Sequence, residues 1–261
     1  MPNADQALIL TRREEDVITI SLNRAHQFNA LSEALLQALI DYLAPLQEDT
    51  TLRCVVIEAQ GRAFCAGHDL KEMRSKPDLT YYRELFTHCG QLMQLIRALP
   101  VPVIAKVQGI ATAAGCQLVA ACDLAISADT AKFAVSGINV GLFCSTPAVP
   151  LSRNVPTKQA FEMLFTGRFI DAHSAQRWGL INDVVTPAEL DARVQSLVDD
   201  IVAKSNAAVR YGKRMFYQQL EMPLAEAYAY ASEVMAQNMM EDDVAEGIDA
   251  FIQKRAPVWS S

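Results

Sequence analysis

The sequence has no run of apolar residues long enough to cross a bilayer, so nothing in it predicts a transmembrane helix. It also lacks an excess or a run of basic residues, because 23 Lys and Arg residues stand against 30 Asp and Glu residues, for a net charge of -7. A protein that binds nucleic acid through a basic surface is therefore not indicated.

Cysteine and histidine are sparse and are not spaced as ligands. The six cysteines include no C-x-x-C pair, and several lie inside apolar segments, as reduced core thiols do. His26, His88 and His173 are far apart, and we predict no metal site. Residues 1–6 lack the basic head and apolar core of a signal peptide. Together these features predict a cytoplasmic protein.

The chain contains enough hydrophobic residues to form a large core. Its 261 residues, 51% of them hydrophobic, suit one large domain or one domain with an appendage. Strand patterns at 17–22, 54–58, 103–107, 124–126 and 132–135 alternate with helical patterns, one of them capped by Ser32. This alternation predicts an α/β architecture with crossover connections.

The second half of the chain is almost wholly helical in pattern. Residues 136–150, rich in Gly, Ser and Pro, are expected to be irregular and near the site. Helices are expected at 157–165, 172–178, 187–203, 206–219, 223–240 and 242–254. The late helices have apolar stripes but few strands to cover, so they must pack against the core or another subunit, and we expect an oligomer. We place an approximate domain boundary near Pro187–Ala203, before these late helices.

Two stretches that are rich in small residues are candidates for binding an oxyanion. Val103–Leu118 begins as a strand, turns at Gly109 and enters a helix through Ala and Gly. N–H groups in a first helical turn have no intrahelical partner, and the helix dipole makes that end electropositive. Gly61–Lys71 is a similar loop after the strand at 54–58. Two converging N–H donors are therefore predicted.

These stretches and three others, in the same order, resemble the enoyl-CoA hydratase/isomerase (crotonase) superfamily. The matching pieces lie within Leu22–Leu31, Ala63–Leu70, Gly109–Asp123, Thr166–Ile181 and Glu246–Pro257, so the resemblance covers nearly the whole chain. The segment Phe133–Gly167 further resembles a divergent subgroup, the enoyl-CoA hydratase domain-containing proteins.

The resemblance implies a spiral of ββα units over residues 1–197, with an acyl-CoA site, and a C-terminal helical trimerisation region over 198–261. It implies a homotrimer or a dimer of trimers, and a role in fatty acid metabolism. Coenzyme A would enter as part of the thioester substrate, with no tightly bound cofactor. The N–H groups of His68 and Ala114 would bind the thioester oxygen.

The resemblance also implies further site residues. Contacts to coenzyme A are expected from Arg24, Ala66, Asp69, Leu70, Lys71 and Lys254, and Arg255 is a further candidate. The substrate pocket is expected to include Ser136, Gly137, Gly141 and Cys144. Arg and Lys suit phosphate contacts, although Lys71, Lys254 and Arg255 are equally compatible with a solvated surface.

The sequence departs from the family at both catalytic glutamates. The first glutamate position is Gln117 and the second is Gly137. Hydration needs one group to activate water and another to deliver a proton, and neither residue does this at neutral pH. Ordinary hydratase activity is therefore predicted to be weak, although Gln117 is expected to touch the substrate or its water.

Three functions stay open at this point. The first is an acyl-CoA enzyme that uses other groups, such as a decarboxylase or a thioester hydrolase, with candidate side chains His68, Asp69, Gln117, Ser136, Cys144 and Ser145. The second is a weak hydratase, and the third is a non-catalytic CoA-ester binder or an assembly subunit. Each candidate also has a structural interpretation: a solvent-facing imidazole for His68, a helix cap for Asp69 and a packed thiol for Cys144.

Overall fold

The computed structural model describes residues 7–260, so the N-terminal segment 1–6, predicted to carry no signal peptide, lies outside the described residues. A six-stranded sheet forms the centre, in the order β1-β2-β3-β5-β7-β10. All neighbouring pairs are parallel except β1 and β2. The strands are β1 (Ile9–Glu14), β2 (Val17–Leu22), β3 (Cys54–Ala59), β5 (Val103–Val107), β7 (Leu124–Ala128) and β10 (Asp183–Val185).

A second, four-stranded sheet has the order β4-β6-β8-β9. Its strands are β4 (Ala63–Cys65), β6 (Ile110–Thr112), β8 (Lys132–Ala134) and β9 (Ile170–Asp171). The pairs β3-β4, β5-β6 and β7-β8 are consecutive in the chain, so each turn of the spiral supplies one strand to each sheet. This arrangement confirms the predicted spiral of ββα units.

Helices α1 (Glu33–Leu43), α3 (Leu79–Ala98) and α4 (Ala114–Ala121) pack together over the main core. α1 begins where predicted, because the Ser32 side chain accepts a hydrogen bond from the Leu35 N–H at 3.2 Å. α3 buries a stripe at helical spacing that includes Leu85, Leu92 and Ile96. This packing fixes the position of α4, whose first turn enters the site.

The stretch 136–150, expected to be irregular, is partly helical. A 3-10 helix, η4 (Ser136–Val140), precedes α5 (Ser145–Asn154), which contains Pro147 and Pro150. These prolines lack N–H donors, and this weakened the helical pattern in the sequence. The other elements before the C-terminal region are η2 (Ala25–Gln27), η3 (Ala44–Glu48), α2 (Leu70–Ser75), α6 (Thr157–Thr166) and α7 (Ala172–Arg177).

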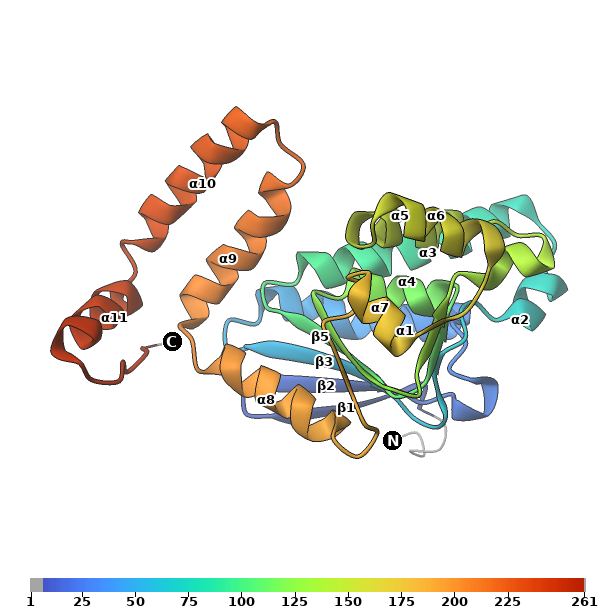
Figure 1. The fold of residues 1–261 in the computed structure, drawn as a ribbon, viewed down its shortest axis with the longest axis horizontal. Coiled ribbons are helices and arrows are strands. Elements are labelled where there is room, and N and C mark those ends of the chain that lie inside the picture. Colours follow the sequence, from blue (N-terminus) through green and yellow to red (C-terminus); the bar gives the residue numbers. More distant parts are fainter. Residues whose placement is uncertain (1–6, 261) are drawn as a thin grey trace.

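The last four helices are α8 (Leu190–Val202), α9 (Asn206–Gln219), α10 (Leu224–Asn238) and α11 (Asp242–Gln253). α8 packs on the opposite face of the main sheet, so residue 198, the predicted start of the trimerisation region, falls inside a core helix. α9, α10 and α11 extend away from the core (Figure 1). No helix within residues 7–260 has the length and apolar character needed to span a membrane.

A buried ion pair joins α9 to the core. The ammonium of Lys213 lies 2.7 Å from the Asp123 carboxylate and also donates to the carbonyl oxygens of Ile96 and Val101. The Tyr217 hydroxyl donates to the other oxygen of Asp123 at 2.7 Å. Because both charges are largely buried, loss of either partner would leave an uncompensated charge.

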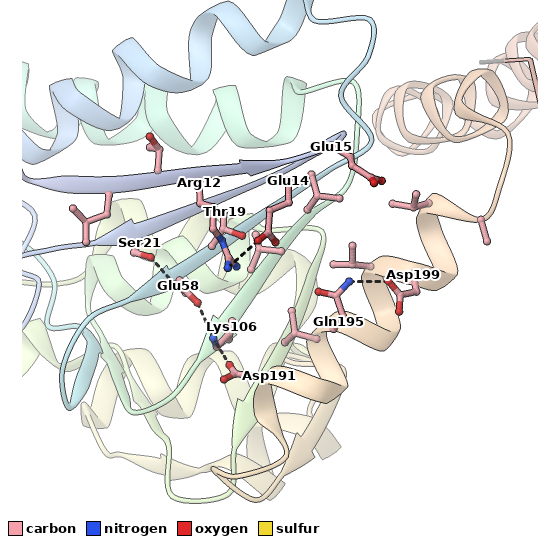
Figure 2. Close-up of a pocket in the computed structure, with 18 residues that line it drawn as sticks. Arg12, Glu14, Glu15, Thr19, Ser21, Glu58, Lys106, Asp191, Gln195 and Asp199 are labelled. Atoms are coloured by element: carbon pink, nitrogen blue, oxygen red, sulfur yellow. Dashed lines mark hydrogen bonds and ion pairs between the residues drawn. The ribbon is translucent and has the colours of Figure 1, made fainter.

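A groove of about 1000 Å³ separates α8 from the strands β1 and β2. Figure 2 shows a chain of contacts across it, in which Ser21 donates to Glu58 and Lys106 bridges Glu58 and Asp191. This chain fixes α8 to the sheet. Both cations drawn in the groove are paired, Arg12 with Glu14 and Lys106 with Glu58 and Asp191, so neither of them is a free donor.

Candidate functional site

The candidate site lies where three short parallel strands end. β4, β6 and β8 are neighbours, and both pairs are parallel. Because the carboxyl ends of parallel strands meet at one edge of a sheet, the segments that follow these strands converge. Those segments begin at Ala66, Ala113 and Val135, so the structure brings together the two predicted oxyanion loops and the segment around Gly137.

The loop after β4 presents the backbone N–H of His68. Leu31 bonds to the residues on either side of it: its N–H donates to the Gly67 carbonyl at 2.8 Å, and its carbonyl accepts from the Asp69 N–H at 3.2 Å. The N–H of His68 therefore points away from Leu31 and donates to no main-chain group among residues 7–260. Gly67 has φ +90°, a conformation that favours glycine.

The second predicted donor, the N–H of Ala114, lies in the first turn of α4. Ala113, just before it, has φ 50° and ψ -120°, an uncommon conformation for a residue with a Cβ. A Cβ built on Gly67 would lie 3.2 Å from the Ala114 nitrogen, so the two loops are in direct contact. Gly115 lets α4 approach β4, because a Cβ there would collide with the Cys65 carbonyl.

A cavity of about 210 Å³ adjoins these loops. Its described lining includes no Asp, Glu, Lys or Arg side chain. Among the predicted site residues, the cavity brings together Ala66, His68, Leu70, Ala114, Ser136, Gly137, Cys144 and Ser145. The site is thus an apolar cavity with two main-chain donor loops and a few neutral polar groups.

The His68 imidazole is inside the protein and does not face solvent. Both ring nitrogens are buried, and neither makes a hydrogen bond within residues 7–260. The ring meets Phe86 edge to face, with centroids 5.5 Å apart. Burial lowers the pKa of His68 to about 4, an effect that is offset only in part by the main chain of Leu31, which lies near the ring without the geometry of a hydrogen bond. The imidazole is therefore neutral at pH 7.

Ser136, Gly137 and Cys144 also line the cavity. The Ser136 hydroxyl is 2.7 Å from the Thr112 hydroxyl, and the Gly137 N–H donates to the Cys144 sulfur at 3.3 Å. Burial raises the pKa of the Cys144 thiol, which favours a packed thiol over a nucleophile. A Cβ on Gly137 would lie 2.5 Å from the Leu142 carbonyl oxygen and 2.8 Å from the Cys144 sulfur. The space that a larger side chain would need at 137 is filled.

Gln117 is not in the cavity lining, in contrast to its predicted contact with the substrate. It is only 3% exposed, and its side-chain oxygen accepts from the Cys89 thiol of α3 at 3.7 Å. It lies on the first turns of α4, but its side chain points into the packing between α4 and α3. The sequence placed Gln117 on the right helix, and the direction of the side chain depends on the packing of α3.

Arg24 and Asp69 form one polar cluster beside the site. The Asp69 carboxylate accepts from the N–H groups of Lys71 and Glu72, which confirms it as the cap of α2. Arg24 donates to the same carboxylate at 3.1 Å. Burial is the largest single effect and would raise the pKa of Asp69, but the hydrogen bonds from the Glu72 N–H, Arg24 and the Lys71 N–H together outweigh it and lower the pKa. Asp69 is therefore an ionised capping residue, which argues against a general base.

Besides Gln117, Arg24 and Asp69, three further predicted residues are not in the cavity lining. Lys71 is exposed on α2 beside the cavity, and Gly141 lies between the lining residues Val140 and Leu142. Lys254 ends α11, which Figure 1 shows on the opposite side of the chain from α2. Arg255, the further candidate, is paired with Glu246 there. Within one chain, neither Lys254 nor Arg255 reaches the site.

The cavity also contains residues that the sequence did not assign to it: Met73, Phe86, Ala113, Val140, Leu142, Phe143, Thr146 and Pro147. Phe86 belongs to the apolar stripe of α3, but no pattern distinguishes a stripe residue that faces a cavity from one that faces the core. The other unassigned residues include Val140, Leu142, Phe143, Thr146 and Pro147. These five belong to the stretch 136–150 that was expected near the site, and this expectation was the available signal.

The sequence model of the family described as enoyl-CoA hydratase/isomerase matches residues 12–261. The chain belongs to this family. Enoyl-CoA hydratase domain-containing protein 3, mitochondrial, of Rattus norvegicus is 46% identical over 259 residues, which cover 99% of this chain and 86% of the relative. The human protein of the same name is 45% identical over 249 residues, covering 95% and 82%. The predicted membership of the divergent subgroup is thereby confirmed.

Solved structures of the family agree with the fold. A crystal structure of an enoyl-CoA hydratase from Mycobacterium smegmatis matches with a TM-score of 0.97 and 55% identity, covering 98% of this chain and 100% of that one. The human enoyl-CoA hydratase domain-containing protein 3 matches with a TM-score of 0.94 and 44% identity, covering 97% and 100%.

The predicted cytoplasmic location is wrong by the same comparison. The relatives from rat, mouse, frog and human that share 45–46% identity with the chain all have names that place them in the mitochondrion. The cysteine pattern behind the prediction indicates a reducing compartment but does not distinguish one such compartment from another.

Proposed function

We propose that this family member is an acyl-CoA thioester enzyme of enoyl-CoA hydratase/isomerase type that stabilises an enolate between the N–H groups of His68 and Ala114. The observation that carries the proposal is the contact between the two loops, with Gly67 against the Ala114 nitrogen at the mouth of an apolar cavity. Both loops present main-chain donors at the ends of parallel strands, one of them in the first turn of a helix.

Two such donors suit the chemistry of a thioester. Removal of an α-proton, or addition of water to an enoyl thioester, moves negative charge onto the thioester oxygen. A preorganised donor aimed at that oxygen lowers the barrier by roughly 3–4 kcal/mol, because it needs no reorganisation during the reaction. A substrate that displaces water from the apolar cavity strengthens the electrostatic interaction.

We propose that ordinary hydratase activity is weak. No carboxylate is among the described residues that line the cavity, and Gln117 packs against Cys89. The lowered pKa of His68, about 4, makes its neutral imidazole a weak base. Without a group that takes a proton from water and one that returns it, a contribution of about 10²–10⁴-fold per group is lost.

The test is crotonyl-CoA hydration, measured beside a relative that has both glutamates. Turnover close to that of the relative would contradict the proposal of weak hydratase activity. A panel of enoyl-, malonyl- and hydroxyacyl-CoA esters, followed by mass spectrometry of the products, then identifies any other reaction. For an enzyme that uses this oxyanion site, we expect the wild type to convert at least one ester and Ala114→Pro to convert none.

A second candidate function is binding of a CoA ester without turnover. The same absence of ionised side chains from the described cavity lining favours it, since a binder needs the two donors but no acid or base. Binding of the panel esters with no product in any case would support this function and exclude the first.

We further propose that coenzyme A contacts Ala66, Leu70 and Lys71 beside the cavity mouth, and that the chain forms a trimer through α9–α11. Ala66 and Leu70 line the cavity, and Lys71 is exposed on the adjacent turn. Leu224, Met235 and Phe251 on the late helices are 76%, 71% and 84% exposed, which favours a covering subunit.

A further inference from the structure

The loop that presents the His68 N–H is held by one short segment, residues 28–31. On one side of His68, the Ala66 N–H donates to the Phe28 carbonyl at 3.0 Å. Leu31 pairs with His68 in an isolated parallel bridge, and its N–H and carbonyl bond to the residues before and after His68. The direction of the His68 N–H is therefore set by the position of residues 28–31.

The side chain of Asn29 fixes the position of that segment. It is 0% exposed, and its amide group donates to the carbonyl oxygens of Gln60 at 2.9 Å and Ala63 at 2.8 Å. Its oxygen accepts from the Arg24 N–H at 2.9 Å. Gln60 follows β3 and Ala63 begins β4, so Asn29 ties residues 28–31 to both ends of the turn between these strands.

The backbone at this point also suits asparagine. Phe28 and Asn29 have φ 52° and 54°, in the left-handed region where asparagine is one of the few enriched residues other than glycine. Glycine would fit the same backbone, but it would leave the carbonyls of Gln60 and Ala63 without their amide donor. Asn29 is not in the cavity lining, so any effect on a ligand must act through the loop.

We propose that Asn29 is a positioning residue, which aims the His68 N–H at the thioester oxygen by fixing residues 28–31 to the turn between β3 and β4. This inference rests on the proposed function, because it takes the thioester oxygen to bind the N–H groups of His68 and Ala114. A hydrogen bond weakens steeply when its donor is misaligned. Loss of the Asn29 amide should therefore weaken the polarisation of the thioester carbonyl, although Asn29 does not touch the ligand.

The test measures that polarisation directly. Butyryl-CoA labelled with carbon-13 at its carbonyl is bound to each protein, and the carbonyl stretch is read from an isotope-edited infrared difference spectrum. Asn29→Gly fits the left-handed backbone and removes the whole side chain. Asn29→Asp keeps the shape and the acceptor but loses the amide donors. Ala114→Pro, which deletes the other N–H, is the positive control.

Asn206→Ala is the matched control for a general loss of stability. Asn206 is also a buried asparagine, 5% exposed, and its amide group donates to the Thr50 carbonyl at 3.0 Å. Its oxygen accepts from the Arg210 guanidinium at 3.0 Å. It begins α9 and is not in the cavity lining. Thermal unfolding of every variant shows whether it is folded and how much stability it has lost.

In the wild type, we expect the bound carbonyl to absorb at a lower wavenumber than the free ester, because two donors draw charge onto its oxygen. This shift should fall to roughly half in Ala114→Pro and in each Asn29 variant that folds, because one of the two donors is lost or misaimed. It should keep its wild-type value in Asn206→Ala. A fall in either folded Asn29 variant, with the control unchanged, supports the inference.

An unchanged shift in both Asn29 variants, or an equal fall in Asn206→Ala, would overturn the inference. If neither Asn29 variant folds, amide-resolved hydrogen exchange of the wild type decides. The Ala66 and Asp69 N–H groups should then exchange slowly with and without butyryl-CoA, and the His68 N–H should become slow only when the ester is bound. Fast exchange at Ala66 and Asp69 would overturn the inference, because residues 28–31 would not hold the loop.

Failure of the proposed function gives a different result. A wild-type protein that does not bind butyryl-CoA, or that binds it without any shift of the carbonyl stretch, would overturn the oxyanion site itself. A wild-type shift that the Asn29 variants retain would overturn only the role of Asn29, so the two failures are distinguishable.

Discussion

Restoring the two missing glutamates should not create a hydratase. At position 137, a Cβ alone would lie 2.5 Å from the Leu142 carbonyl and 2.8 Å from the Cys144 sulfur, both closer than real Cβ contacts. Overpacking of this kind costs about 1–3 kcal/mol, and a glutamate has still more atoms to place. Gly137→Glu must therefore displace the 136–144 segment, and its carboxylate would not occupy the cavity wall as it now stands.

The substitution at position 117 fails for a different reason. Gln117 is 3% exposed, lies outside the cavity lining and has Cys89 as its side-chain partner. A carboxylic acid there would be desolvated without a cation beside it, so burial would raise its pKa and favour the neutral form. It would neither accept a proton at pH 7 nor reach the substrate.

The assay is crotonyl-CoA hydration by Gln117→Glu, Gly137→Glu and the double variant. We expect the hydration rate of each variant to rise by less than about tenfold over the wild type, although each group of a working acid–base pair contributes about 10²–10⁴-fold to the rate. Gly137→Ala should lower the free energy of unfolding by about 1–3 kcal/mol. The matched control is Gly90→Ala in α3, where a Cβ meets nothing within 4 Å and the protein should not lose stability. A gain of roughly a hundredfold in the double variant would refute the reasoning from space and burial.

Three further predictions concern the oxyanion donor, the C-terminal anchor and pH. Ala114→Pro removes one N–H and should lower the turnover of any converted ester by about 10²–10³-fold. Ala114→Gly keeps the N–H, and its turnover should stay within about threefold of the wild type. Equal rates of the two variants in steady-state assays would show that Ala114 is not in the site. Lys213→Met leaves Asp123 buried without its cation and should lower the free energy of unfolding, measured by chemical denaturation, by about 3–5 kcal/mol. The control Arg12→Met removes an exposed pair and should lower it by less than about 1 kcal/mol. A similar loss in both variants would show that burial of the pair does not matter. Because the folded pKa of His68 is about 4, below an unfolded value of about 6.5, the unfolded chain binds more protons between these values, and this residue should lower the stability by up to about 3 kcal/mol as pH drops from 6.5 to 4. In pH-dependent unfolding, His68→Leu should remove this contribution and leave that of carboxylates such as Asp69 and Glu246, whose pKa values are also lowered. An unchanged slope would contradict the burial of the ring.

Long periodic segments could be predicted from the sequence because their burial follows from local pattern. The helix expected at 206–219 is α9 with the same bounds, and the strand expected at 17–22 is β2. In the second sheet, β8 was expected at 132–135, but β4 and β6 were not predicted, because they have three residues each and show no period-2 alternation. Their existence depends on pairing between distant segments, which a local pattern does not contain. β1 was missed as well, since Arg12, Arg13 and Glu14 interrupt its apolar pattern on an edge strand.

The candidate site was only partly predictable for a related reason. Small residues and glycines identified the two loops, because close backbone approach leaves a signature in the sequence. Side-chain direction leaves none: Gln117 and Ala114 belong to the same short helix, yet only Ala114 lines the cavity. The buried imidazole of His68 likewise depends on Phe86 from α3, a segment with no sequence link to the loop.

The account depends most directly on where the thioester oxygen binds. The measurement is a crystal structure of the protein with a non-reactive acyl-CoA, such as a thioether or a saturated ester that is not turned over. We predict that the carbonyl oxygen, or the atom in its place, lies roughly 2.7–3.1 Å from the main-chain nitrogens of both His68 and Ala114. A complex in which that oxygen contacts neither nitrogen, with the acyl group outside the cavity, would contradict the central claim.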